Sequence, residues 1–421
     1  MATTSAATPG DRAFPIGRRE LVAMLALVQA LQALAIDAIL PALPDLARDL
    51  AVSDPNRRQL VIGLFMIGMG AGSLLPGTLA DRFGRKPVLL VSVLAYILTG
   101  LACALATDFT VLAALRLIGG LLSGGLAAVG LAIVRDRYEG SEMASTQSLI
   151  FMVFMVVPML APTLGQLILL AAGWRAIFGL TAVLGALVGL WIALRLPESL
   201  HPAYRQPITV ARVFGSTRDV LLCRESIGYV VTTAMTVGVM WGYIQSCEQL
   251  LGEHFGAGAA FPVLFGGMAL FMGVANFTNS RIVLRFGARR TGHTALLAYG
   301  TTALVLFTLA HTGALTLWRF VPLWVMVMVC GSFMSANFSS VALQPFARIA
   351  GSASSLQLFI RTTAGSLMAA TIGQSYDNTA RPLTTALLLT ATVGLAAILF
   401  SERGRLFRRV NPPGTPLDPV P

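Results

Sequence analysis

The chain alternates between long apolar runs and short polar gaps. Windows of about 20 apolar residues, the length that lets a helix cross about 30 Å of hydrocarbon, recur throughout. Six of them lie at residues 20–41, 58–79, 87–107, 109–134, 146–170 and 174–195. Six more lie at residues 220–246, 258–283, 293–311, 317–340, 352–375 and 382–401. The pattern predicts an all-α membrane protein of twelve transmembrane helices in two six-helix bundles.

The longest polar stretch inside the chain separates the two sets of apolar runs. It covers residues 196–218 and contains three prolines, which disfavour a continuous helix. We therefore expect residues 1–195 to form the first bundle and residues 219–401 to form the second. The stretch between them is expected to be a cytoplasmic linker, and residues 402–421 a cytoplasmic tail.

Composition and charge agree with a membrane protein. Of the 421 residues, 56% are hydrophobic and 12% are charged, about half the charged fraction of ordinary soluble domains. The net charge of +11 does not indicate nucleic-acid binding, because Lys and Arg occupy the gaps between apolar runs instead of one folded face. Of the 30 Lys and Arg, 22 fall on the side of the two termini and 6 on the other side. The positive-inside rule then places both termini in the cytoplasm.

Other features limit the chemistry that the chain can perform. The four cysteines lie in or beside separate apolar runs without paired spacing, so neither a disulfide nor a metal site is indicated. The first 19 residues carry no cleavage site after a short apolar core, so the first apolar run is expected to be a retained helix. The four histidines lack the HExxH spacing, and no P-loop is present. These observations argue against a membrane-embedded enzyme or an ATP-driven pump, and no cofactor is expected.

A short charged hinge between two apolar runs occurs twice. Its first copy, residues 77–87, reads GTLADRFGRKP. The triplet RFG at residues 82–84 recurs 203 residues later, at residues 285–287, again between two apolar runs. Two halves that each carry the same charged hinge between apolar runs are typical of a transporter built from repeated bundles.

The first hinge resembles the signature of the major facilitator superfamily, in which a glycine and a short gap precede Asp-Arg-x-Gly-Arg-Arg/Lys. The matching residues are Gly77, Asp81, Arg82, Gly84, Arg85 and Lys86. Further segments resemble the Bcr/CflA branch of twelve-helix drug/proton antiporters, and they are residues 35–44, 116–120, 158–165 and 349–355. The resemblance covers nearly the whole chain. It implies the fold of this superfamily and proton-coupled export of drugs.

The resemblance assigns conformational gating to the first hinge. Asp81 is expected near the start of the third helix, where negative charge is favoured, with Arg82 and Arg85 as its local partners. The sequence departs from the family pattern at four positions, which are Gln29, Gly119, Gln166 and Leu284. Of these, Leu284 replaces the acid of the second hinge, and Gln29 stands where some relatives carry a second membrane carboxylate.

The fifth predicted helix also resembles a gating element. Pro158 and Pro162 would weaken its hydrogen-bond ladder and permit a bend. Together with Gly165, they resemble the antiporter signature of the superfamily.

Two ionisable residues in the apolar runs are candidates for proton coupling. Asp37 is the only acid well inside a run, about four residues from the outer end of the first predicted helix. An acid there must face water, pair with a cation or hold a proton, unless it is a helix-end residue wetted by the interface. Arg116 is expected at a similar depth in the fourth helix. There its positive charge would favour loss of the proton from Asp37. Alternatively, Arg116 serves in helix packing, with its guanidinium reaching the outer membrane interface.

A substrate cavity is predicted from residues spread over both halves. Arg361 lies about nine residues into the eleventh predicted helix, near the bilayer midplane, either as a cavity residue or as a partner of backbone carbonyls. The neutral candidates are Gln29, Gln32, Tyr243, Gln245, Asn337 and Gln357. Each of them is also compatible with ordinary helix packing. As a set, they predict a mostly apolar cavity with scattered polar groups.

The function favoured by the sequence is proton-coupled efflux of small amphipathic drugs or toxic compounds across a bacterial inner membrane by alternating access. A metabolite exporter or facilitator with the same fold is the first alternative, and a membrane-embedded enzyme is the alternative from another class. With one membrane carboxylate and two membrane arginines, a neutral or weakly acidic substrate is favoured over a dication. The expected partners are the substrate, protons and the bilayer, and we expect a monomer.

Overall fold

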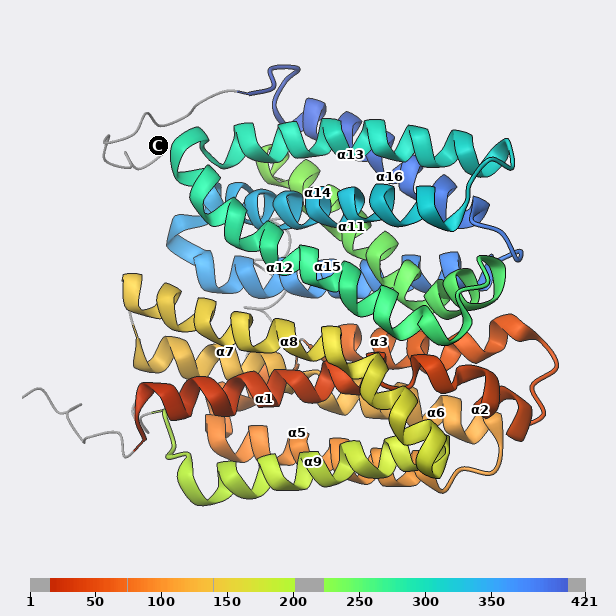
Figure 1. The fold of residues 1–421 in the computed structure, drawn as a ribbon. Coiled ribbons are helices and arrows are strands. Elements are labelled where there is room, and N and C mark those ends of the chain that lie inside the picture. Colours follow the sequence, from red (N-terminus) through yellow and green to blue (C-terminus); the bar gives the residue numbers. More distant parts are fainter. Residues whose placement is uncertain (1–15, 74, 139, 201–222, 408–421) are drawn as a thin grey trace, which may run out of the picture.

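The computed structural model of the chain describes residues 16–73, 75–138, 140–200 and 223–407 (Figure 1). The regular elements within these ranges are all helices. This confirms the all-α fold class. Most of the predicted linker and tail lies outside the described residues.

The described part of the first half contains seven helices of 13 or more residues and several shorter ones. Their bounds are α1 (Arg18–Asp37), η1 (Leu40–Ala42), α2 (Leu43–Asp49), η2 (Pro55–Gln59), α3 (Leu60–Gly72), α4 (Leu75–Phe83), α5 (Arg85–Ala104), α6 (Phe109–Ser123), α7 (Gly125–Arg137), α8 (Gly140–Ala172) and α9 (Trp174–Arg195). Helix α6 begins where it does because the Asp108 carboxylate accepts hydrogen bonds from the backbone N–H groups of Thr110 and Val111, at 2.7 and 3.1 Å. These backbone bonds hold the pKa of the Asp108 carboxyl below its ordinary value.

The second half repeats this arrangement. Its elements are α11 (Arg224–Cys247), the π-helical η4 (Glu248–His254), η5 (Gly258–Ala260), α12 (Phe261–Phe286), α13 (Ala288–His311), α14 (Leu317–Leu343), η6 (Gln344–Ile349), α15 (Ala350–Gln374) and α16 (Arg381–Ser401). In Figure 1 the helices of the two halves form two groups that meet along α3, α8, α12 and α15.

The described residues include ten helices that are long and apolar enough to cross a membrane, or eleven if the pair α3 and α4, bent by 46°, counts as one span. The other long helix is α15, whose 25 residues would extend about 37 Å. It is more polar than the others because it carries Gln357, Arg361 and several Ser and Thr residues. With α15 included, the helices correspond to the twelve predicted spans.

The internal repeat is visible in the backbone. Gly84 precedes α5 with φ of 105° and ψ of 155°, and Gly287 precedes α13 with φ of 82° and ψ of 153°. These two positions are 203 residues apart, and a side chain would be strained at both of them. Tyr96 and Tyr299, also 203 residues apart, are both buried, and neither hydroxyl has a hydrogen-bond partner among the described residues. The repeat found in the sequence therefore extends to backbone conformation and core packing.

Helix α1 begins and helix α16 ends at the same end of the helix bundle (Figure 1). We call it the terminal end, and we call the opposite one, where α1 ends and α2 lies, the far end. Large apolar side chains on the outer helices are exposed, for example Leu98 on α5 and Leu187 on α9, at 57% and 59%. Such apolar exposure suits contact with lipid.

Candidate functional site

Asp37 is the last residue of α1 and is 5% exposed. Its carboxylate makes no hydrogen bond or ion pair with any other residue that the structure describes. The nearby groups include the Cys247 thiol at the end of α11, which lies within electrostatic range of the carboxylate. Since α1 and α11 belong to different halves, Asp37 lies beside the seam between them.

The end of α1 is also held by α8. Gly165 of α8 packs directly on the backbone of Ala38, and a side chain at this position would overlap it. Pro158 and Pro162 lie within the same continuous helix, α8. The segment that resembles the antiporter signature thus reaches the residue that follows Asp37.

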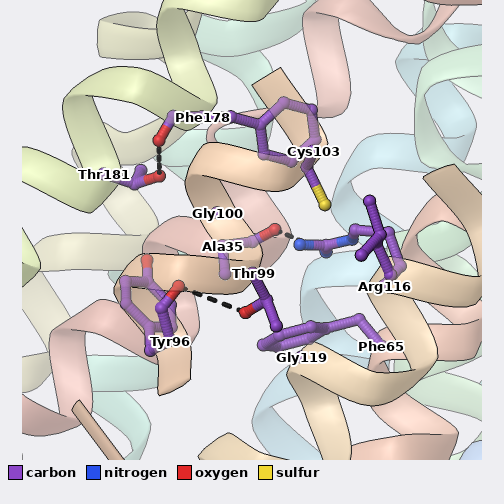
Figure 2. Close-up of a pocket in the computed structure, with 11 residues that line it drawn as sticks. Ala35, Phe65, Tyr96, Thr99, Gly100, Cys103, Arg116, Gly119, Phe178 and Thr181 are labelled. Carbon is purple, nitrogen blue, oxygen red and sulfur yellow. Dashed lines mark hydrogen bonds between the residues drawn. The ribbon is translucent and has the colours of Figure 1, made fainter. Parts of the chain in front are cut away.

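Arg116 lies inside the first half, 4% exposed (Figure 2). Its Nε donates to the Val61 carbonyl at 2.6 Å, and its Nη2 donates to the Ala35 carbonyl at 2.7 Å. The guanidinium also lies 4.2 Å from the centre of the Phe65 ring. Arg116 therefore clamps α1 to α3, two residues from Asp37, and the structure does not join it to the Asp37 carboxylate by an ion pair.

The pocket in Figure 2 surrounds Arg116 with residues of α1, α3, α5, α6 and α9. Its cavity volume is only about 20 Å³, far below the range of roughly 300–1,000 Å³ that is usual for ligand pockets. Its lining residues all belong to the first half, so the pocket does not join the two halves. It is part of the packing of that half.

Three of the predicted cavity residues pack inside their own half. Gln32 donates to the Ser123 carbonyl at 2.8 Å, and Asn337 donates to the Asn279 side chain at 2.7 Å. The Tyr243 ring lies 4.5 Å from Trp324 in an aromatic cluster of the second half.

The other four predicted cavity residues are placed differently. Gln245 crosses to the first half, where its amide donates to the Met66 sulfur at 3.8 Å. Gln29 and Arg361 are only partly buried, and neither forms a hydrogen bond or ion pair with any described residue. The Gln357 amide nitrogen is buried without a partner. Of these four residues, Gln29, Arg361 and the amide nitrogen of Gln357 have no hydrogen-bond partner among the described residues.

The first hinge forms a cluster around Arg85 at the terminal end. Arg85 contacts Asp81 at 2.6 Å and Asp136 at 2.9 Å. Glu198 accepts from the backbone N–H of Arg85 at 2.8 Å, so a carboxylate stabilises the first turn of α5. Asp81 lies on α4 instead of at the start of the third helix, and Arg82 is exposed. Of the two expected partners of Asp81, the structure therefore pairs it with Arg85.

Two glycines of this hinge have different surroundings. Gly84 has the positive φ described above, with the Glu198 carboxylate beside it. Gly77 on α4 has open space around the position of a side chain.

The second hinge uses a different acid. Leu284 stands in place of the carboxylate, and Arg289 instead bonds to Glu402, which follows α16, at 2.8 Å. Tyr229 also donates to Glu402 at 2.6 Å. Burial opposes ionisation of Glu402, but the bonds from Tyr229 and Arg289 prevail and hold the pKa of its carboxyl below the ordinary value.

The two halves are joined at the far end by a group of polar residues that the sequence analysis missed. Arg58 on η2 contacts Glu253 at 2.6 Å and Glu248 at 3.4 Å, both on η4. We call these three residues the Arg58 cluster. Beside it, Asn56 donates to the Tyr376 carbonyl at 2.7 Å. Among described residues, the hydrogen bonds and ion pairs between the halves all lie toward this end.

The signal for this cluster was present but weak. Arg58 lies at the edge of an apolar run, where it counts as an ordinary loop charge. Glu248 lies two residues beyond the predicted end of a span. Sequence spacing alone does not show that these two edges meet.

The chain matches the family model described as Major Facilitator Superfamily over residues 25–370. It is 30% identical over 405 residues to the uncharacterized MFS-type transporter YdgK of Bacillus subtilis (strain 168), covering 93% of this chain and 98% of the relative. It is also 30% identical over 369 residues to the multidrug resistance protein MdtL of Salmonella heidelberg (strain SL476), covering 86% of this chain and 90% of the relative.

Solved structures share the fold. One is a D-xylose-proton symporter, with a TM-score of 0.70 and 16% identity, covering 91% of this chain and 96% of that one. Another is a bacterial homologue of the human lysosomal transporter Spinster, with a TM-score of 0.66 and 15% identity, covering 94% of this chain and 96% of that one.

Proposed function

Because this chain belongs to the major facilitator superfamily, whose members are transporters and not enzymes, we propose that it exports small amphipathic compounds in exchange for protons. The name of the relative MdtL supports drug export. The positive-inside bias supports a multi-pass protein of the bacterial inner membrane with a cytoplasmic terminal end. The far end then faces outward, and the described conformation is the one closed to the outside.

Asp37 carries the proton-coupling part of the proposal. It is buried at the seam and pairs with no cation among the described residues, and an ionised carboxylate in such a place is costly, so the closed state favours its protonated form. Parting of the halves at the far end would expose Asp37 to water and allow exchange of its proton. Arg116 acts as a positioning residue, since it holds the last turn of α1 through the Ala35 carbonyl.

The substrate is proposed to bind between the halves. Arg361, halfway along α15 and without an acidic partner among the described residues, suits a weakly acidic or neutral compound better than a dication. Gln29, Gln245 and Gln357 supply hydrogen bonds to it. A drug-susceptibility panel in a pump-deficient bacterial host, with and without the chain, identifies the compounds. No change in susceptibility to any drug would favour a metabolite exporter or facilitator.

The test of coupling is substrate-induced proton release from the purified protein, followed with a pH dye in weak buffer. Asp37→Asn should abolish the release, because reciprocity requires that substrate binding lower the affinity of the same site for protons. Asp45→Asn is the matched control, since Asp45 is an exposed acid paired with Arg48 on α2. Undiminished release from Asp37→Asn would place the proton site elsewhere.

The orientation has its own test. Reporter fusions after Arg408 and within residues 196–218 should both report cytoplasm. An external signal from either fusion contradicts the proposed topology.

A further inference from the structure

The Arg58 cluster places two acids on one base across the seam. Arg58 is 6% exposed and Glu248 is 7% exposed, whereas the side chain of Glu253 is 47% exposed. Both carboxylates approach the same atom, the Arg58 Nη2, and the shorter contact is the one with Glu253. Glu253 thus has both the better contact with the guanidinium and access to water.

The negative charge of an ionised Glu248 carboxylate is not fully balanced by Arg58. Its Oε2 is buried and has no hydrogen-bond partner in the described part of the chain, and the same holds for the Arg58 Nε. Among the described residues, the charged or titratable groups that interact with Glu248 are Arg58, Cys247, Glu253 and Tyr376. Arg58 is the single guanidinium among them. One guanidinium balances one carboxylate, and a second buried carboxylate must either remain uncompensated, at high cost, or take up a proton.

We propose that Glu248 is a second proton-binding site, which takes up a proton from the far-end solution when the halves close there. Closing buries Glu248 next to the Arg58–Glu253 ion pair and favours its neutral form. Opening exposes it to water and releases the proton to the same solution. The site therefore makes closure at the far end depend on pH. This inference rests on the proposed function only for the statement that the far-end solution is the outside.

The direction of the pH dependence follows from linkage. The closed state binds one more proton than the open state, so low pH favours closure and high pH favours opening. For one linked proton, the ratio of closed to open molecules changes by up to about tenfold per pH unit. In an exporter driven by protons that enter from outside, an acidic exterior would close the far end.

The experiment measures the distance between two spin labels at the far end by pulsed electron paramagnetic resonance. The labels are placed by Arg48→Cys on α2 and Thr312→Cys after α13, exposed positions on opposite halves, in the full chain with its four native cysteines replaced. The closed fraction is recorded in lipid nanodiscs between about pH 5 and about pH 8, a range that spans the titration of such a carboxyl. No substrate is added.

Glu248→Gln mimics the protonated acid, so its closed fraction should be high and should depend less steeply on pH than that of wild type. Glu253→Gln leaves Arg58 with one carboxylate, so the rise in closure at low pH should disappear or reverse, because acid then breaks the remaining pair. Asp377→Asn is the matched control and should keep the wild-type slope, since Asp377 is an exposed far-end acid that bonds to Thr379.

Two results would overturn the proposal. One is a wild-type slope in Glu248→Gln, and the other is a wild-type closed fraction that does not change with pH. Asp37→Asn separates this proposal from the proposed function. If Asp37→Asn alone abolishes the slope, the pH dependence belongs to Asp37 and the inference about Glu248 is wrong, whether or not the chain exports drugs.

Discussion

Contact between α3 and α15 is a close backbone approach across the seam that a single substitution can test. A Cβ at Gly70 would lie 3.0 Å from the Thr363 Cα and 3.1 Å from the Thr362 carbonyl carbon and oxygen. All these atoms belong to the backbone of α15, so none of them can turn away. In Gly70→Ala the two helices must separate by several tenths of an ångström.

The cost of this separation falls on the closed state alone. Inserting a methyl group into a packed contact costs about 1–3 kcal/mol. Since each 1.4 kcal/mol is a factor of ten, the ratio of closed to open molecules should fall by roughly 5- to 150-fold. The measurement is the distance between labels at positions 48 and 312, at one fixed pH.

Two matched variants remove the general effect of replacing glycine with alanine in a helix. In Gly63→Ala the new Cβ would meet the Gln245 Oε1 at 2.7 Å, the end of a flexible side chain that can move aside. In Gly267→Ala nothing lies within 4 Å. Both should stay closer to wild type than Gly70→Ala does. If Gly70→Ala shows the same distance distribution as Gly267→Ala, packing of α3 on α15 does not control closure and the argument fails.

Three further predictions concern the clusters within each half. Asp81→Asn should lower the export rate without changing expression. It should cost only about 0.3–1 kcal/mol of stability, because the Asp81 side chain is 43% exposed. Asp136→Asn should lower the unfolding temperature more, because the Asp136 side chain is only 17% exposed. Because the pKa of the Glu402 carboxyl is lowered, its contribution to stability is present above about pH 4.5 and is lost as pH falls. The unfolding temperature of Glu402→Gln should therefore fall less in acid than that of wild type. The exposed control Glu225→Gln should behave like wild type. Arg116→Gln should lower the unfolding temperature, since each lost bond from the charged donor contributes about 1.5–3 kcal/mol, and an unchanged temperature would show that the clamp between α1 and α3 is unimportant.

The features that the sequence predicted are local ones. The spans follow from runs of apolar residues, and the hinge repeat follows from a triplet that returns after 203 residues. The positive φ of Gly84 and Gly287 agrees with the choice of glycine at both positions, because a side chain is strained there. Such features depend on a few neighbouring residues, so they can be read without knowledge of the partners.

The pairings between helices could not be predicted in this way. Hydropathy gives the depth of Asp37 and Arg116 but not the direction in which each side chain points around its helix. The structure turns Arg116 into the first half and turns Asp37 toward the seam, although their depths are similar. Tyr243 shows the same limit, since a polar tip on an apolar ring serves a packed core as well as a cavity.

The two hinges share a backbone and differ in chemistry. In the first, Arg85 is held by Asp81, an acid four residues earlier on the neighbouring helix α4. In the second, Arg289 is held by Glu402, which follows the last helix of its half. Movement of α4 against α5 would therefore break an ion pair in the first half, whereas the matching movement of α12 against α13 leaves the pair with Glu402 intact. We infer that the first hinge has the larger part in controlling whether the terminal end opens. An acid at position 284 is dispensable, because Glu402, which follows α16, already holds Arg289.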